Sequence, residues 1–487
     1  MDLFKLINRT LPRTSDRSIW FLLVVTAISI PLSVKLYSAG KDLEVIFPAE
    51  LLVGLTALLV GLLWLVSERA RSALDMSALK HPITILIALD LVISIMSYWG
   101  SDEPMVSLKW LVVRTSYVLV FFLVPLLIRQ FTSEKIIELM TYHSWALILV
   151  VVWVFKAAVE QGGDRTVANY SCMPFYNDHT IYAAALVFAL FTFMINAFSL
   201  EKKGVSLFGP VVSVLLVFVV MIAIALSYTR AAWLSVVVVG IIGVVLLVRP
   251  RPVVWIGCTV IIGFVAFFSW GPLQKAALEN NGDADADNAG ITEVLWSYAN
   301  VSTDASNRER LVRWSSAYSI FLADPFLGCG PGMFKFTYPL YQDPDHASFR
   351  TVPQPTKAYI SRVWEPTSGL MVRDNPQNLY VDPGTAHSEY LLALSERGPV
   401  ALILFIGIFV SVVLRYVNRS RELTDRSAKI QFLLVVLAIL AYGVHGFFNN
   451  FLDDCKIALP FYFFLAIFIR MDSGRILLNE PTLDHLA

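Results

Sequence analysis

His387 opens the run His387-Ser388-Glu389-Tyr390-Leu391 at the end of a long polar segment, about residues 271–386, in an otherwise apolar chain. An imidazole exchanges a proton near neutral pH, so a histidine can serve as a general base. A base placed where a hydrophilic insert meets a bilayer could act on a membrane-bound substrate. The sequence therefore predicts proton-transfer chemistry at His387.

The residues around His387 predict a helix that begins beside it. Thr385 or Ser388 can cap its first turn, and Gly398-Pro399 marks a break before the next apolar stretch. The positive end of a helix dipole disfavours an imidazolium and attracts anions. We therefore expect a neutral imidazole, available as a base.

Three arginines are candidate anion ligands. Arg230 lies in a short hinge between two apolar stretches, where it is either a snorkelling interfacial arginine or a ligand for a lipid phosphate. Arg310 and Arg313 are three residues apart, so they share one face of the helix predicted over 308–323. They form either a solvated helix face or a clamp whose planar guanidinium groups suit a diphosphate.

That predicted helix carries an apolar face away from the two arginines and ends before Asp324-Pro325. The face consists of Leu311, Trp314, Tyr318, Phe321 and Leu322. A turn-rich loop follows, because Gly328, Gly330 and Gly332 with Pro331 are incompatible with regular structure.

Other polar clusters carry weaker predictions. Residues 283–287 imitate the start of a calcium loop but lack its glycine and its bidentate glutamate, and Asp343-Pro344-Asp345-His346 is more typical of a solvated turn than of a metal site. Asp178-His179 and the polar residues from His445 to Asp454 are typical of span caps. Cys172, Cys329 and Cys455 fall in segments predicted to face outward, and three thiols cannot all pair.

Composition places the chain in a membrane. Of 487 residues, 56% are hydrophobic and 16% charged, against about 25% charged in a soluble domain. Apolar stretches long enough to cross a bilayer predict about twelve spans. They lie at 19–38, 47–66, 82–99, 107–128, 137–158, 180–199, 207–227, 231–248, 253–270, 398–416, 428–448 and 455–470. With 38 basic and 38 acidic residues, nothing in the net charge favours a nucleic-acid partner.

Lys and Arg concentrate in the short loops of one side, which predicts that both termini are cytoplasmic and that the long loop faces outward. We expect an all-α polytopic fold in three parts. Residues 1–270 hold nine spans, 271–397 form the outward loop with short helices and the catalytic segment, and 398–487 hold three spans and a cytoplasmic tail.

In this organisation the chain resembles bacterial O-antigen ligases of the Wzy-C superfamily. Three stretches carry the resemblance: Tyr228-Thr229-Arg230, the segment from Arg310 through Gly332, and His387-Ser388-Glu389-Tyr390-Leu391 with Glu396-Arg397-Gly398. Ala401 stands where the family often has glycine, which puts local packing in doubt rather than chemistry.

The resemblance implies an inverting glycosyltransferase of the bacterial inner membrane, with its active site on the periplasmic face and no metal or other cofactor. Its donor would be O-antigen polysaccharide on undecaprenyl diphosphate, and its acceptor a sugar of lipid A-core. His387 would be the base, Arg230 and Arg310 would hold the diphosphate, and Arg313, Glu389 and Tyr390 would contact substrate. Acid–base chemistry agrees, because the attacking hydroxyl loses a proton while the diphosphate gains charge.

Three alternatives stay open. An O-antigen polymerase and a protein O-oligosaccharyltransferase share the donor chemistry and differ in the acceptor. A lipid-linked glycan transporter would also have about twelve spans. Against it, the sequence shows neither an inverted repeat nor matching spans broken by Gly or Pro.

Overall fold

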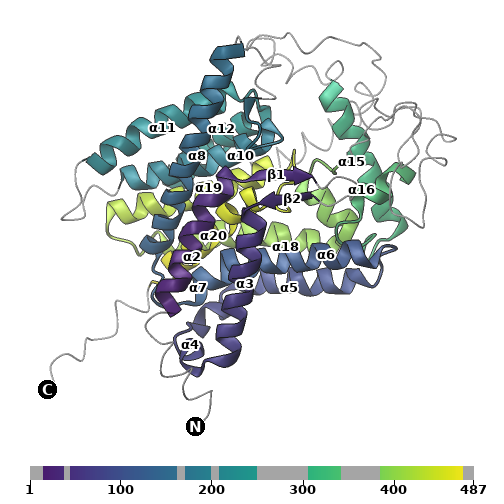
Figure 1. Ribbon diagram of the computed structural model, residues 1–487, viewed down its shortest axis with the longest axis horizontal. Helices are drawn as coiled ribbons and strands as arrows, with labels where there is room; N and C mark the ends of the chain where they lie inside the picture. The colour runs from purple at the N-terminus through teal and green to yellow at the C-terminus, as the bar shows by residue number, and fades with distance from the viewer. Residues whose placement is uncertain are drawn as a thin grey trace.

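The computed structural model describes residues 15–37, 44–161, 171–198, 208–248, 305–341 and 384–474, and most of them form a bundle of helices (Figure 1). The first half contains α2 (Ser15–Leu32), β1 (Val34–Tyr37), β2 (Glu44–Phe47), α3 (Ala49–Val66), α4 (Glu68–Ser72), η1 (Met76–Lys80), α5 (Pro82–Tyr98), α6 (Pro104–Tyr117), η2 (Val118–Leu123), α7 (Val124–Leu127) and α8 (Ser133–Gln161). The second half contains α10 (His179–Ala197), α11 (Phe208–Leu226), α12 (Arg230–Val248), α15 (Ala305–Ala323), α16 (Phe334–Thr337), η4 (Tyr338–Tyr341), α18 (Glu389–Arg419), α19 (Arg426–His445) and α20 (Cys455–Ser473).

The helices agree with the predicted membrane spans. Within the described residues, 8 helices are long and apolar enough to cross a bilayer, and two shorter apolar helices, Arg17–Leu32 and Pro82–Tyr98, accompany them. Every predicted span overlaps a described helix except 253–270, which lies outside the described residues. The protein is thus a multi-pass membrane protein, while the total of twelve spans stays a prediction.

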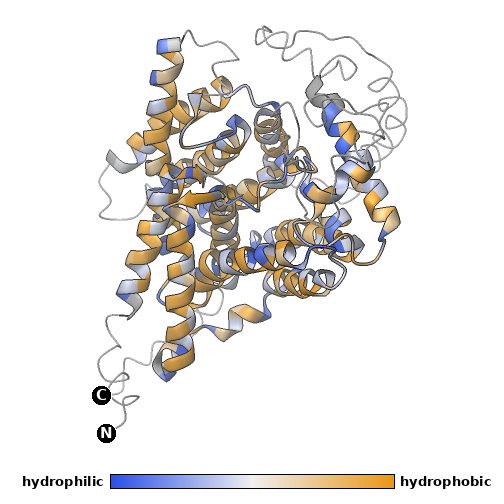
Figure 2. Ribbon diagram, turned by 45° about the vertical axis from the view of Figure 1, so that its right-hand side comes forward, coloured by the Kyte–Doolittle hydropathy of each residue, from blue (hydrophilic) through white to orange (hydrophobic). Residues whose placement is uncertain are grey.

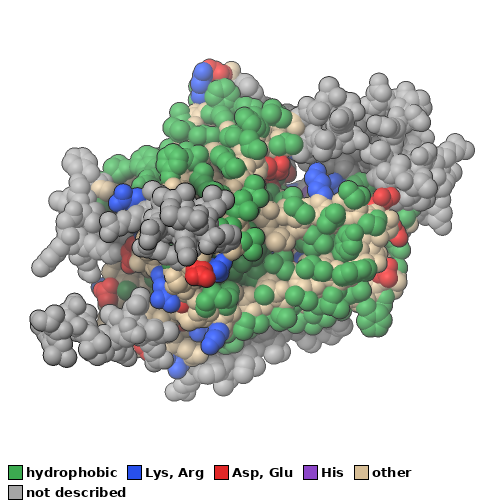
Figure 3. Space-filling model, turned by 60° about the horizontal axis from the view of Figure 1, so that its bottom comes forward, with side chains coloured by type: hydrophobic (Ala, Val, Ile, Leu, Met, Phe, Trp, Pro, Cys, Tyr) green, Lys and Arg blue, Asp and Glu red, His purple; other side chains and the backbone are tan. Residues whose placement is uncertain are grey.

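The bundle is apolar inside and outside, as a lipid solvent requires. α20 runs through its middle and is buried along most of its length. The outer helices present apolar side chains, such as Leu51, Phe218 and Ile241, each more than half exposed. Figures 2 and 3 show mainly hydrophobic helices and a face covered largely by hydrophobic side chains.

The first predicted span, 19–38, was too long. α2 ends at Leu32, and Val34–Tyr37 pairs antiparallel with Glu44–Phe47 in a small hairpin. The hydroxyl of Ser33 accepts the Ala49 N–H at 3.2 Å and so joins the end of α2 to the start of α3. Hydropathy measures apolar length but not backbone pairing, which explains why the all-α expectation missed this hairpin.

α18 is broken at Gly398-Pro399, as the sequence predicted, and the break is where the glycine-rich loop attaches. Pro399 has no N–H, so it cannot satisfy the Ser395 carbonyl within the helix. That carbonyl instead accepts the Cys329 N–H at 3.0 Å, and the Glu396 carbonyl accepts the Gly330 N–H at 3.0 Å. The loop thereby completes the hydrogen bonds of the kinked helix.

Glycine is needed on both sides of this junction. Gly398 has φ 77°, and a Cβ there would overlap the Phe326 carbonyl; Gly328 has φ 67° and faces the Glu396 backbone. The Glu396 carboxylate accepts the Phe334 N–H at 2.9 Å. Loop and helix are therefore locked together, which places α15 and α16 beside the first turns of α18 (Figure 1).

The helix predicted over 308–323 is confirmed as α15, but its predicted apolar face was only partly right, since Trp314 is buried and two other members are not. Tyr318 and Leu322 are exposed, whereas Val312, Arg313 and Ile320 are buried. The prediction placed both arginines on the face opposite the apolar side chains and did not foresee that Arg313 is buried. The guanidinium of Arg313 has protein partners that allow its burial, and they come from distant parts of the chain.

Candidate functional site

His387 occupies a backbone conformation that side chains rarely adopt. Its φ is 48°, and among the described residues the other non-glycine residue with positive φ is Tyr228 at 51°, two residues before Arg230. Such conformations persist when surrounding contacts hold them, and they cluster at functional sites. The two segments that carry the predicted base and one predicted anion ligand thus share this feature.

α15 holds the His387 segment through its backbone. The indole N–H of Trp314 donates to the His387 carbonyl at 3.3 Å, and Nη1 of Arg313 donates to the Thr385 carbonyl at 2.9 Å. Arg313 also pairs with Glu309 at 2.6 Å and lies over the ring of Tyr338. Since it is almost fully buried among these partners, Arg313 is built into the wall that positions His387.

Contacts on the other side of His387 fix the start of α18. Ser388 caps the helix by accepting the Leu391 N–H at 3.4 Å, which confirms one of the two predicted caps. The Glu389 N–H donates to the Gly446 carbonyl at 2.8 Å, which joins α18 to the turn that follows α19. His387 is therefore held between α15 and the end of α19.

The carboxylate of Glu389, a predicted substrate contact, has several partners within the protein. Its Oε1 accepts the Tyr442 hydroxyl at 2.5 Å and the N–H groups of Phe451 and Leu452 at 2.8 Å each. A carboxylate that accepts so many donors orders the chain that supplies them. Glu389 thus organises the segment after α19 at the edge of the site.

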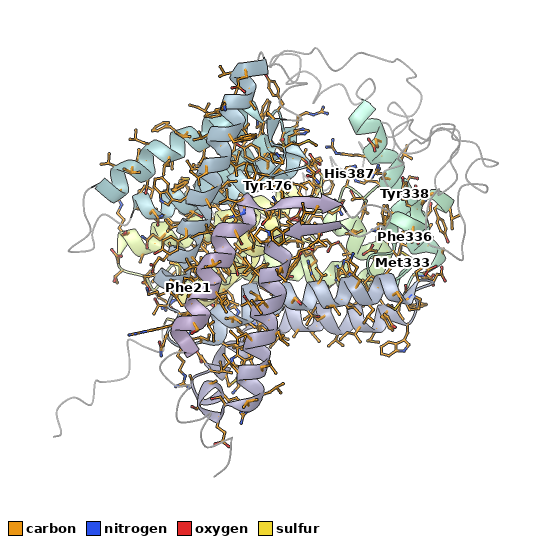
Figure 4. All side chains as sticks on the ribbon, in the orientation of Figure 1. Phe21, Tyr176, Met333, Phe336, Tyr338 and His387 are labelled. Atoms are coloured by element: carbon orange, nitrogen blue, oxygen red, sulfur yellow. The ribbon has the colours of Figure 1, made fainter. Side chains whose placement is uncertain are left out.

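The imidazole of His387 is partly buried and lies on the side of the bundle that faces α15 and Tyr338 (Figure 4). Burial lowers its pKa well below the ordinary value of 6.5, and the charges of Arg313 and then Arg310 lower the pKa further. The neutral imidazole is therefore the form present at neutral pH. The sequence anticipated this form from the helix dipole, whereas burial and two guanidinium groups produce it.

Arg310 lies one turn before Arg313 on α15 and is less buried. Its charge acts on two imidazoles, that of His387 and that of His445. The structure therefore separates the two arginines that sequence reasoning left equivalent. Arg313 holds the backbone of the site, and Arg310 brings positive charge to it.

Arg230 is the first residue of α12. Lys456, at the start of α20 just after α19, donates to the Phe175 carbonyl just before α10, so the end of α19 and the start of α10 lie at one end of the bundle. The Thr229 hydroxyl donates to the His179 carbonyl at 3.4 Å and fixes the turn before Arg230. Arg230 therefore belongs to the same end of the bundle as His387.

Tyr390, the remaining predicted substrate contact, faces an apolar pocket. Its hydroxyl donates to the Gly443 carbonyl at 2.8 Å, and its ring packs on Phe405 and Phe447. The pocket has a volume of about 410 Å³ and is lined by Ile242, Tyr390, Phe409, Leu440, Gly443, Val444, Phe447 and Phe448. One of its lining residues, Tyr390, is three positions after His387. The apolar lining suits a hydrocarbon chain and not a charged group.

Two buried arginines, Arg397 and Arg114, join α18 and the segment after α19 to neighbouring helices. Arg397 pairs with Asp90 at 2.5 Å, and Arg114 donates to the Leu452 carbonyl at 3.1 Å. Both guanidinium groups lie against the ring of Trp110. Asp90 and Arg397 are 307 positions apart, so no local pattern in the sequence reveals that they pair.

The other polar candidates have ordinary roles where they are described. Asp178 caps α10 by accepting the Thr180 N–H at 2.7 Å, as predicted. Cys172, Cys329 and Cys455 are buried, and burial raises the pKa of Cys172 to about 12 and also raises that of Cys329. Residues 283–287 and 343–346 lie outside the described residues. Within the described ranges, no group of three His, Cys, Asp or Glu side chains could hold a metal ion.

Comparison with known proteins gives one family. Residues 213–356 match the profile of the O-antigen ligase family, Wzy_C, and this range contains Arg230, Arg310 and Arg313. No curated protein matches the chain. The match confirms the resemblance seen in the sequence. The matched residues thus support membership of the O-antigen ligase superfamily.

Proposed function

We propose that the protein is an O-antigen ligase that transfers polysaccharide from undecaprenyl diphosphate to a sugar hydroxyl of lipid A-core at the periplasmic face of the inner membrane. Membership of the superfamily implies a lipid-linked glycan substrate. The observation that carries the proposal is His387, kept neutral beside Arg310 and Arg313 at the start of α18. A neutral base beside guanidinium groups suits a reaction that removes a proton while an anion departs.

The reaction is a single displacement. His387 takes the proton of the acceptor hydroxyl while that oxygen bonds to the anomeric carbon of the donor sugar. The bond from that carbon to the diphosphate oxygen breaks, and undecaprenyl diphosphate leaves with the electron pair. Attack from the side opposite the leaving group inverts the anomeric configuration.

Arg310 and Arg230 are proposed to stabilise the charge that develops on the leaving diphosphate. Both are partly exposed, and both stand at the end of the bundle where His387 lies. Arg313 and Glu389 are proposed to position the reacting groups, since protein atoms already engage them. The pocket beside Tyr390 is proposed to take the first part of the polyprenyl chain, because it is apolar and one of its lining residues, Tyr390, is three positions after His387.

The test is reconstitution of the purified protein with undecaprenyl-diphosphate-linked glycan and lipid A-core, with the products read on a gel. Glycan attached to lipid A-core is the expected result. Elongation of the lipid-linked glycan would instead identify a polymerase, and transfer to an added acceptor protein would identify a protein O-oligosaccharyltransferase. No transfer to any acceptor would refute the glycosyltransferase proposal.

A further inference from the structure

His445 is a buried histidine that the proposed reaction leaves without a role. It is the last residue of α19 and is 2% exposed. Its ring lies parallel to that of Tyr442 and close to that of Phe451, with centroids 6.5 and 5.7 Å away. These contacts fix the orientation of the imidazole, so its two nitrogens have defined surroundings.

One nitrogen is engaged, and the other is available. Nε2 of His445 lies 3.2 Å from Nδ2 of Asn449. An amide nitrogen donates and cannot accept, so Nε2 is the acceptor, and a neutral ring carries its proton on Nδ1. In the described part of the chain Nδ1 is buried and has no hydrogen-bond partner. A buried donor without an acceptor is costly, and it marks a position where a ligand can supply the acceptor.

The location of His445 indicates which ligand this is. The carbonyl of the next residue, Gly446, accepts the N–H of Glu389 at 2.8 Å, and Glu389 is two residues after His387. Phe447 contacts Trp314, whose indole holds the His387 carbonyl. The charge of Arg310 acts on the imidazoles of both histidines. Both imidazoles are therefore within electrostatic range of the guanidinium that is proposed to hold the diphosphate.

We propose that His445 is a second histidine of the donor site, and that its Nδ1–H donates a hydrogen bond to an oxygen of the donor diphosphate. This inference rests on the proposed function, since it concerns the same donor. Asn449 sets the tautomer by occupying Nε2. His387 then removes the proton from the acceptor, and His445 holds the leaving group without exchanging its own proton.

The test uses two substitutions that each keep one of the two hydrogen-bonding groups of the ring. Asparagine places its amide N–H near Nδ1 as a donor, whereas glutamine places its amide oxygen near Nε2 as an acceptor for Asn449. The probe is undecaprenyl diphosphate in detergent, with its Kd measured for the full-length protein alongside the KM for the lipid-linked donor. His445→Asn should stay within about threefold of the wild type. His445→Gln should weaken binding by about tenfold or more, the effect of one hydrogen bond to a charged group.

Two results would overturn the role of His445. Equal binding by both variants and the wild type would show that Nδ1 contacts no phosphate. Binding retained in His445→Gln and lost in His445→Asn would show that only the contact with Asn449 matters. If the wild type transfers glycan in either case, the proposed function survives. If the wild type binds no undecaprenyl diphosphate, the donor itself is wrong.

A second measurement reads the ring of the wild type directly and uses a variant only to assign its signal. Nitrogen-15 spectra of the wild type with labelled histidine should show a neutral ring protonated at Nδ1, whose Nδ1 resonance shifts when undecaprenyl diphosphate is added. A signal protonated at Nε2, or one that does not respond to the ligand, would contradict the assignment. The His445→Asn spectrum identifies the signal.

Discussion

The indole N–H of Trp314 donates to the main-chain carbonyl of His387 at 3.3 Å, across 73 positions of sequence. This bond ties α15, on the polar insert, to the strained residue that precedes α18. The insert is therefore part of the wall of the proposed active site. It fixes the backbone that aims the imidazole.

Trp314→Phe should slow transfer by about fivefold, because it removes one hydrogen bond worth about 1 kcal/mol and leaves His387 less firmly held. The ring contact with Phe447 should remain. Initial rates in reconstituted membranes measure the effect. Trp153→Phe is the matched control, because it removes an indole bond to the Met173 carbonyl elsewhere in the bundle. Equal rates for both variants would show that the Trp314 bond does not position His387.

Lysine substitutions should separate the two arginines of α15. Arg313→Lys keeps the charge but cannot hold both Glu309 and the Thr385 carbonyl, so kcat should fall about tenfold with little change in donor KM. Arg310→Lys should mainly raise the donor KM, because a planar contact with the diphosphate is lost. Steady-state kinetics with varied donor provide the test, and the reverse pattern would exchange the two roles.

The pH dependence of transfer should follow the base. Because the pKa of His387 lies well below 6.5, the rate should stay level through neutral pH and fall only when acidification protonates the imidazole. The unfolded chain takes up that proton near pH 6.5, so this residue's contribution to folding stability is also lost as the pH falls below 6.5.

Arg310→Gln removes a charge that lowers the pKa of His387, so the acid limb of the pH profile should move to higher pH. Arg230→Gln is the control, since Arg230 is not among the groups that shift this pKa. It should slow transfer without moving the limb. If the acid limb moved equally in both variants, the protonation of His387 would not be what sets the pH dependence.

Adding a side chain at the kink in α18 should lower the stability of the fold. Gly398→Ala places a Cβ against the Phe326 carbonyl at φ 77° and should lower the free energy of unfolding by about 2 kcal/mol or more. Gly240→Ala, in the open interior of α12, should be neutral or stabilising by up to about 1 kcal/mol. Thermal unfolding in detergent compares them, and equal midpoints would mean that the loop does not press on the kink.

The sequence alone predicted those features of the fold that depend on residues close together in the chain. Apolar length predicted the spans, Asp178 and Ser388 predicted helix starts, and Gly398-Pro399 predicted the kink. Each signal depends on residues a few positions apart. Ala401 departs from the family pattern, yet it is fully buried in α18, so the structure accommodates its methyl group.

The remainder of the site depends on distant partners. The burial of Arg313 requires the Thr385 carbonyl, and Glu389 requires Tyr442 and the 451–452 backbone. No periodicity reveals such pairs. The glycines were the one sequence feature that indicated a long-range contact, since Gly328 and Gly398 are required by the close approach of loop and helix.

The central claim is that His387 is the base. Its most direct test is transfer of lipid-linked glycan to lipid A-core by reconstituted wild type, His387→Ala and His387→Gln, with undecaprenyl diphosphate binding and thermal unfolding measured on the same preparations. The account predicts that both variants fold and bind the lipid diphosphate, while transfer falls by at least about a hundredfold, the contribution expected of a general base. Transfer at the wild-type rate by either variant would contradict it.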